Sequence, residues 1–312
     1  MNVEAEGRAA AQRFRHEHHL GVQPLGDLVT VIEQTTGIDV AVLDVGPDEH
    51  GLAMRDPDRA VVFIGVARTR HPMRQRSTLA HELAHVLFED WTDTESVDQS
   101  EPSPREGRCR AFARHLLLPL EGLREFLGGR QEVTLASLSA VVQRFLVSPA
   151  IAAIALEQAE YIDRPISERW AELYTPQLAA RFGWTDQYRA LQTESDKRRT
   201  PQQLLTRTIN GYALGVLSAQ AIATLRGVTL EEAEADLREA GVDPIEPAVT
   251  WADASDLPDV NVDLSGLDDD APRGDEPGAA AWRPSGWSTR DVLSRSSRSS
   301  SSRARAPWDP SH

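Results

Sequence analysis

The chain has 312 residues, 40% of them hydrophobic, which is enough for a buried core and for one or two domains. It carries 33 basic and 48 acidic side chains, and a net charge of −15 disfavours a protein whose main role is to bind nucleic acid. No apolar run reaches the roughly 18 residues that a membrane-spanning helix needs. The N-terminus lacks the apolar stretch of a secretory signal, and the single cysteine, Cys109, cannot form an intramolecular disulfide. These features predict a cytoplasmic location.

The first 70 residues change from helical to strand periodicity. Residues 5–20 and 25–36 have the spacing of helices. Residues 38–45 and 60–66 are apolar and rich in β-branched side chains, which predicts strands, and residues 51–54 form a shorter candidate between them. A small antiparallel sheet before residue 70 is therefore expected.

Helices are predicted for most of the following sequence. Residues 77–88 form one and residues 105–118 another, which Pro119 ends. Residues 134–160 form a pair broken at Val147, and residues 200–242 form three more. The chain is thus expected to be α+β, with a helix-rich core and a small sheet followed by further helices.

Three domains are predicted from these elements and from composition. Residues 1–130 form an α+β domain that contains the small sheet, and residues 131–245 form a helical domain. Residues 246–312 are rich in Asp, Pro and Gly and then in Ser and Arg, and they contain too little apolar surface to offset chain entropy. A disordered tail is predicted there.

One motif indicates a chemistry. His81, Glu82 and His85 form an H-E-x-x-H sequence, which arises by chance in roughly one in a hundred chains of this length. On a helix, residues four apart lie on one face, so two imidazoles can bind one metal ion. Glu82 lies about 100° around the helix, where it can take a proton from water that zinc has acidified.

Two surface histidines beside an ordinary glutamate would be the simpler interpretation of this motif. The residues around it argue otherwise, because the helix is apolar on nearly every side: Leu79, Ala80, Leu83, Ala84, Val86 and Leu87. Such a helix is buried, and buried His and Glu side chains need partners. A metal site is therefore predicted.

A catalytic zinc takes three protein ligands, so a third must come from outside the motif. Phe88 and Trp91 occupy the positions where a downstream Gly and His would stand in a metzincin. The remaining candidates are carboxylates: Glu89, Asp90, Asp93, Glu95, Asp98, Glu101 and Glu106. The first six lie in a polar stretch with the composition of a loop. Only Glu106 begins an apolar helix, although a first-turn Glu is also favoured by the helix dipole alone.

The stretch from Thr78 to His85, followed by a glutamate-led apolar helix from Glu106 to Pro119, resembles the ImmA/IrrE metallopeptidases. The similarity covers about residues 8–160. It implies that residues 1–130 are a zincin-like metallopeptidase domain. It also implies a gluzincin-like site with one zinc ion, in which His81, His85 and Glu106 are ligands and Glu82 is the catalytic base. Cys109 departs from the family pattern, since an alanine is usual there, and so does Arg110 after it.

The resemblance also implies a role in bacterial regulation. Family members cleave helix-turn-helix repressors, so the expected partner is a protein, in a stress response or in the control of mobile elements. We expect the substrate to bind as an extended segment along a sheet edge near residues 60–66. The alternative is a non-catalytic zinc-containing regulator, or an antitoxin-like protein, that acts by binding a partner. An intact Glu82 argues against that alternative.

Other candidates have weaker support. Cys109 is interpreted as a small buried residue, His115 is expected to point away from the metal, and the histidines near the N-terminus are expected to be solvated: His16, His18 and His19. His71 has no spacing that requires a role. The helix pair at residues 134–160 resembles a DNA-binding motif, but its second helix lacks Arg, Lys and Asn for reading bases. Direct nucleic-acid binding is not expected.

Overall fold

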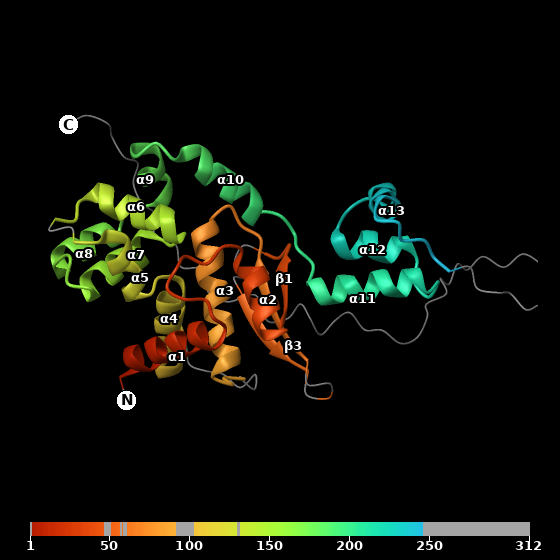
Figure 1. Ribbon diagram of the computed structural model, residues 1–312, viewed down its shortest axis with the longest axis horizontal. Helices are drawn as coiled ribbons and strands as arrows, with labels where there is room; N and C mark the ends of the chain where they lie inside the picture. The colour runs from red at the N-terminus through yellow and green to blue at the C-terminus, as the bar shows by residue number, and fades with distance from the viewer. Residues whose placement is uncertain are drawn as a thin grey trace, which may run out of the picture. The chain divides into compact units, whose positions relative to one another are not determined.

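The computed structural model describes residues 2–46, 51–56, 58, 61–91, 103–129 and 132–245 (Figure 1). All of these belong to one unit, Met1–Val249. The tail predicted to be disordered, residues 246–312, lies outside the described residues.

The sheet has three strands, β1 (Asp39–Leu43), β2 (Gly51–Arg55) and β3 (Val62–Ala67), in the order β1-β3-β2. The antiparallel sheet expected from the sequence is in fact mixed, because β3 is antiparallel to β2 and parallel to β1, with Val40 opposite Ile64. The chain reverses direction twice between β1 and β3, so these two strands run the same way. The α+β class itself is confirmed.

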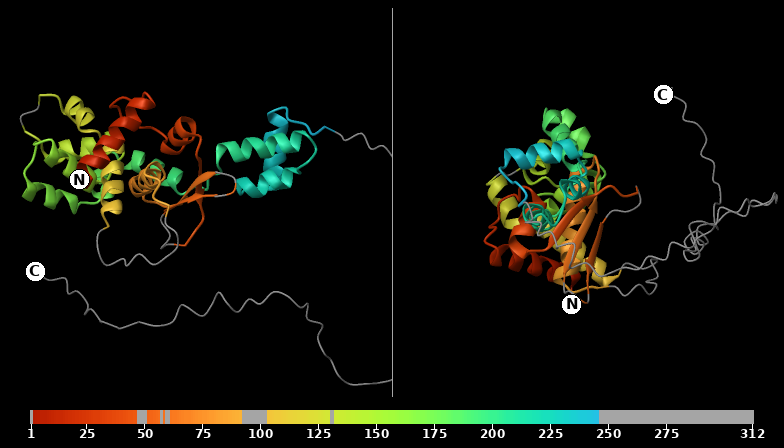
Figure 2. Two further views of the ribbon diagram at one scale, coloured as in Figure 1. Left: turned by 90° about the horizontal axis from the view of Figure 1, so that it is seen from below. Right: turned by 90° about the vertical axis from the view of Figure 1, so that its right-hand side faces the viewer.

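Two helices precede the sheet, α1 (Val3–Glu17) and α2 (Leu28–Thr36). Two more follow it, α3 (Pro72–Leu87) and α4 (Pro104–Leu117). Helix α3 contacts β2 and β3 on one side and α4 on another, and α1 runs beside α4 (Figures 1 and 2). Gly7 allows the close approach of α1, because a Cβ there would lie 2.5 Å from the carbonyl oxygen of Arg108.

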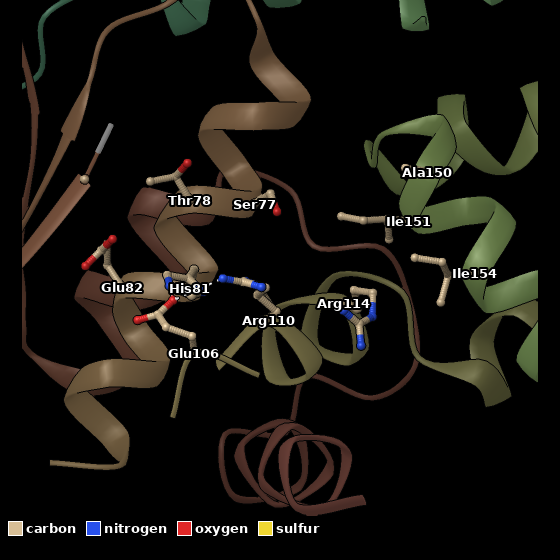
Figure 3. A pocket seen from close by; sticks show the side chains of 12 residues that line it. Ser77, Thr78, His81, Glu82, Glu106, Arg110, Arg114, Ala150, Ile151 and Ile154 are labelled. Atoms are coloured by element: carbon tan, nitrogen blue, oxygen red, sulfur yellow. Dashed lines mark ion pairs between the residues drawn. The ribbon is translucent and has the colours of Figure 1, made fainter. Parts of the chain in front are cut away.

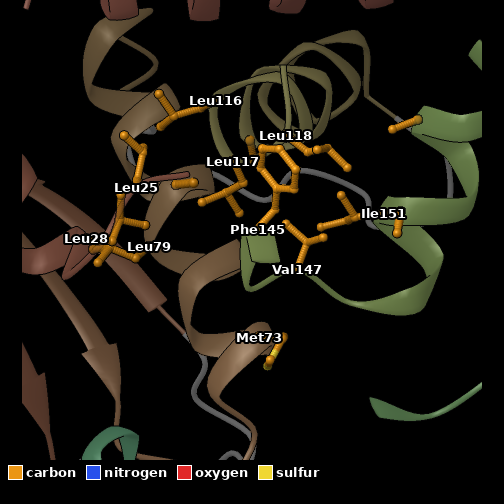
Figure 4. Packing of buried hydrophobic residues seen from close by; sticks show 14 of the residues in the cluster. Leu25, Leu28, Met73, Leu79, Leu116, Leu117, Leu118, Phe145, Val147 and Ile151 are labelled. Atoms are coloured by element: carbon orange, nitrogen blue, oxygen red, sulfur yellow. The ribbon is translucent and has the colours of Figure 1, made fainter. Parts of the chain in front are cut away.

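The next six helices complete the main hydrophobic core: α5 (Leu120–Leu127), α6 (Leu135–Phe145), α7 (Pro149–Gln158), α8 (Arg164–Ala171), α9 (Thr175–Arg181) and α10 (Thr185–Ser195). This core extends from α1 and the sheet to α10, and Figure 4 shows part of it, where Phe145 packs near Leu117 and Leu118. The predicted break between α6 and α7 is confirmed, with Leu146 in the left-handed conformation and Ser148 capping α7.

The last described helices are α11 (Gln202–Ala213), α12 (Ala219–Arg226) and α13 (Leu230–Glu239). They share a second, smaller hydrophobic cluster that includes Ile222, Ala233 and Leu237. The connector before α11 pairs with the outer edge of β1, where Val42 and Arg199 exchange backbone hydrogen bonds of 2.9 and 3.0 Å. The domain boundary predicted at residue 130 stays a prediction.

Among the described residues, no single helix is long and apolar enough to cross a membrane. The pair α6 and α7 reaches that length and composition only when joined, and its two helices meet at 112°.

Candidate metal centre

Helix α3 places the motif. Pro72 stands at its first position, where a proline costs no hydrogen bond, and the helix therefore begins earlier than the predicted start at residue 77. Leu79, Ala80 and Leu83 are buried and hold one side of α3 against the core. His81 and His85 lie one turn apart with side chains only 20% and 18% exposed. Packing of the apolar face thus fixes the face on which both imidazoles lie.

Helix α4 places the third residue. Ser103 caps the helix by accepting a hydrogen bond from the Arg105 backbone N–H, and Pro104 follows at the first position. Glu106 lies in the first turn and is 38% exposed, while the helix beyond it is mostly buried. The sequence favoured Glu106 because it begins an apolar helix, and the structure brings this residue to α3.

The three side chains converge on one point. His81 Nε2 and His85 Nε2 are 3.1 Å apart, and Glu106 places Oε2 3.1 Å from the first and Oε1 3.2 Å from the second. Figure 3 shows His81 and Glu106 pointing toward each other. These distances resemble the edge of about 3.3 Å of a zinc tetrahedron with bonds of about 2.0 Å. Two imidazole nitrogens that face each other also need a proton or a cation between them. The residues present therefore fit a divalent metal.

Glu82 belongs to the same cleft but not to this donor group. Burial, reinforced by the charge of Glu106, raises the pKa of Glu82 to about 7. A divalent cation bound beside it would favour the ionised form. Glu82 faces the start of β2, because a Cβ on Gly51 would lie 2.9 Å from Glu82 Oε1. The arrangement can hold a cation and a proton acceptor side by side.

The second nitrogen of His85 faces a different group. Its Nδ1 lies 3.7 Å from Cys109 Sγ and 3.9 Å from Asp90 Oδ2. The Asp90 side chain is only 6% exposed and accepts a 2.6 Å hydrogen bond from Arg108. Asp90, a candidate third ligand by sequence, thus lies on the opposite side of the imidazole from Glu106. Glu89 joins no such donor group, and the other loop candidates lie outside the described residues: Asp93, Glu95, Asp98 and Glu101.

The remaining sequence candidates do not belong to the donor group of His81, His85 and Glu106. His115 is buried with its Nε2 2.9 Å from Glu4 Oε1, so it contributes to packing of α1 against α4. Cys109 is buried, and burial raises the pKa of its thiol to about 12. His71 precedes the first residue of α3 without capping it through its side chain. In the part of the chain that the structure describes, none of the N-terminal histidines joins a metal-capable group: His16, His18 and His19.

We call His81, His85 and Glu106 the metal-capable group. A cleft of about 390 Å³ opens over this group. Arg110 and Arg114 of α4 line it, and Ile151 and Ile154 of α7 form an apolar wall opposite α3 (Figure 3). Sequence reasoning did not place α7 here. No local spacing could have done so, because the contact depends on the tertiary fold. Next to Glu82, the cleft therefore has basic side chains on one wall and apolar side chains on another.

Comparison with known proteins supports the sequence resemblance. Residues 33–157 match the model of the peptidase M78 family, described as the IrrE N-terminal-like domain. The search of curated proteins gives no match. Among solved structures, a Mycobacterium tuberculosis transcriptional regulator is 23% identical, with a TM-score of 0.37, over 52% of this chain and 48% of that one. The chain thus spans about half the length of that regulator. The matched segment includes α3, α4 and the whole metal-capable group, so the similarity to the peptidase M78, IrrE N-terminal-like family covers the part of the chain that holds His81, His85 and Glu106.

Proposed function

We propose that this chain is a zinc-dependent endopeptidase that binds one zinc ion through His81, His85 and Glu106. The convergence of two imidazoles and one carboxylate, at 3.1 to 3.2 Å from one another, is the observation that carries the proposal. Glu82 beside them supplies the group that a structural metal site would not need.

When bound, zinc would supply a Lewis acid that acidifies water and polarises the peptide carbonyl. The carboxylate of Glu82 takes the proton from the attacking water and passes it to the leaving amine. Its position next to the ligand His81, but outside the donor group, suits that task. The apolar face of α3 is packed in the hydrophobic core, so bulk water cannot reach Glu82 from the core side.

The outer edge of β2 is the favoured place for the substrate. The edge near residues 60–66 expected from the sequence is not available, because β3 lies at the centre of the sheet with a partner on each side. β2 is largely exposed and begins at Gly51, in contact with α3 at Thr78 and Glu82. A peptide that pairs with β2 passes along the cleft, with its side chains between Arg110 and the apolar wall of α7.

The substrate is proposed to be a helix-turn-helix repressor, and the setting bacterial regulation in the cytoplasm, on the strength of the family alone. The alternative, a non-catalytic regulator, makes the opposite prediction for metal removal. A protein that acts only by binding should leave its partner uncut whether or not zinc is present.

The test is incubation of the purified chain with a repressor encoded beside its gene, with and without a chelator. We expect cleavage that the chelator abolishes and that zinc restores. His81→Ala should lose both zinc and cleavage, whereas His16→Ala, an exposed histidine of α1, should lose neither. Intact repressor with a zinc-loaded wild-type chain would contradict the proposal.

A further inference from the structure

A second cavity, of about 480 Å³, lies on another side of α3. It is bounded by the start of α2, by Val42 of β1, by the first half of α3, by the end of α10 and by the connector at residues 197–199. We call it the Arg76 cavity. It shares no lining residue with the cleft over the metal-capable group. A ligand there would therefore not compete directly with a substrate.

Part of the lining of the Arg76 cavity is apolar. This apolar part comprises Leu28, Val29, Val42, Leu79, Leu146 and Leu191. Leu28 and Leu79 lie next to each other where α2 meets α3 (Figure 4). The volume is within the range of roughly 300 to 1,000 Å³ that is typical of sites for small molecules. The interior thus suits a hydrocarbon or aromatic body.

The polar lining is mainly basic. The lining includes four cationic residues, Arg76, Lys197, Arg198 and Arg199, and two acidic ones, Asp27 and Glu194. Each acid already has a partner, since Arg199 pairs with Asp27 and Lys197 with Glu194. Among the described residues, neither Arg76 nor Arg198 forms an ion pair. This excess of positive charge is unusual in a chain with a net charge of −15 and favours an anionic ligand.

Arg76 is the fixed cation of this cavity. Its guanidinium donates to the carbonyl oxygens of Gly26 at 2.6 Å and Leu25 at 2.8 Å, which hold it in one orientation. Carbonyls carry no full charge, and Asp27 offsets part of the charge of Arg76 without forming an ion pair with it. The buried Nε of Arg76 has no hydrogen-bond partner among the described residues and remains for a ligand. Burial lowers the pKa of Arg76 to about 10, so it is still charged at neutral pH. An oxyanion beside it would offset part of the cost of burying that charge.

We propose that the Arg76 cavity binds a small organic anion, an apolar body with one carboxylate, whose carboxylate pairs with Arg76 and Arg198. Recognition requires both parts of the ligand, because the apolar walls select the body and the arginines select the charge. The proposal does not depend on peptidase activity.

Isothermal titration of the full-length protein with decanoate tests this, with 1-decanol as the neutral analogue and anilinonaphthalene sulfonate as a second anionic probe. We expect one decanoate per chain and binding of 1-decanol at least about tenfold weaker, since a charge-assisted hydrogen bond is typically worth that factor or more. The titration is independent of zinc loading and cleavage, so its failure and a failure of the proposed function can be told apart.

Variants locate the binding. Arg198→Gln at the rim should weaken decanoate binding about three- to tenfold, and Arg76→Gln at least about tenfold. Arg76→Gln also removes two hydrogen bonds to backbone carbonyls, so a second variant is needed that leaves every charge in place. Leu191→Trp on α10 fills the cavity and should weaken decanoate binding. Arg189→Gln on the same helix, outside the cavity, is the matched control and should bind like the wild type.

Any of three results would overturn the proposal. The first is the absence of binding for both decanoate and anilinonaphthalene sulfonate. The second is binding that Arg198→Gln and Leu191→Trp leave unchanged, which would place the ligand elsewhere. The third is equal affinity for decanoate and 1-decanol, since charge would then play no part.

Discussion

Helix α3 borders two cavities of opposite character. On one side, His81 and Glu82 meet Glu106 in a cleft whose donor atoms suit a cation. On another side, Arg76 and the basic connector line a cavity that suits an anion. Arg76 and His81 are five positions apart, which places them about 140° apart around the helix. One helix therefore contributes to two sites without either set of side chains reaching the other.

The difference shows that the neighbours of a helix decide the chemistry of each face. Glu106 reaches the first site from α4 and supplies the carboxylate of its donor group. Arg198 and Arg199 reach the second from the connector that follows α10. Neither site exists on α3 alone, so each can be removed by changing a residue outside that helix.

The strongest way to separate the two sites is Glu82→Gln. Peptidase activity should fall by roughly 10² to 10⁴, the usual contribution of a general base, because an amide cannot accept the proton. Zinc content and decanoate binding should not change. Activity and metal analysis on the same preparation provide the measurement, with Glu17→Gln on α1 as the matched control. Full activity in a zinc-loaded Glu82→Gln protein would remove Glu82 from the mechanism.

The next effect concerns the metal alone. Glu106→Ala should weaken zinc binding by more than the 10- to 100-fold that is typical when an outer partner of a metal-bound histidine is lost. Asp90→Asn, which alters the group facing the other nitrogen of His85, should have the smaller effect. Competition with a chromogenic chelator measures both affinities. The reverse order would show that Asp90, and not Glu106, is the third ligand.

A substitution that changes the shape of the site but not its charge should reduce peptidase activity by a smaller factor. In Gly51→Ala the new Cβ would lie 2.5 Å from Thr78 Cγ2 and 2.9 Å from Glu82 Oε1, so β2 and α3 must shift. Misplacement of reacting groups by about 1 Å can cost up to about 100-fold in rate. We expect a loss of peptidase activity within that range, with zinc binding retained. Gly46→Ala, where no atom lies within 4 Å of the added Cβ, is the control and should be fully active.

The smallest effect lies outside both cavities and concerns acid stability. A hydrogen bond with His115, aided by Gln158 and Arg114, lowers the pKa of Glu4 from 4.5 to about 2. Since the folded state depresses this pKa, Glu4 stabilises the protein above pH 4.5, and the contribution is lost as pH falls from 4.5 to about 2.

Glu4→Gln tests this contribution by thermal unfolding over that pH range. The carboxylate is about a third exposed, so we expect only about 1 kcal/mol after screening by water, or a fall in Tm of about 2–4 °C at pH 7. The difference from wild type should vanish near pH 2. A constant difference across the range would show that the carboxylate charge is not responsible.

Local signals in the sequence predicted the elements that carry the metal-capable group. The spacing of His81 and His85 on a helix depends only on helix geometry, and Glu106 was favoured by the apolar residues that follow it. Thr229 stands three residues before Glu232, the spacing of a helix cap, and it accepts a 3.2 Å hydrogen bond from the Glu232 backbone N–H. Thr200 stands at the same spacing before Gln203, yet α11 begins after Pro201 without a side-chain cap.

Features set by tertiary structure could not be predicted. The order of strands depends on which neighbour β3 meets on each side, and the periodicity of β3 is the same in a parallel and an antiparallel pair. The Arg76 cavity joins residues from Gly26 to Arg199, and no spacing along the chain relates them. Arg76 stands five positions before His81, and its contacts with two carbonyls of the segment before α2 have no local signature.

The pairing of Val42 with Arg199 has a consequence for how the molecule behaves in a crowded solution. Unpaired strand edges recruit other chains, and folded proteins usually cover or blunt them. Here the connector to α11 occupies part of the edge of β1, and Arg207 reaches Asp39 at the start of the same strand. Among the residues that the structure describes, no strand pairs with the outer edge of β2, and Leu52 and Met54 of this strand are exposed. Self-association of this protein, where it occurs, should therefore begin at β2, and a charged residue at position 54 should suppress it.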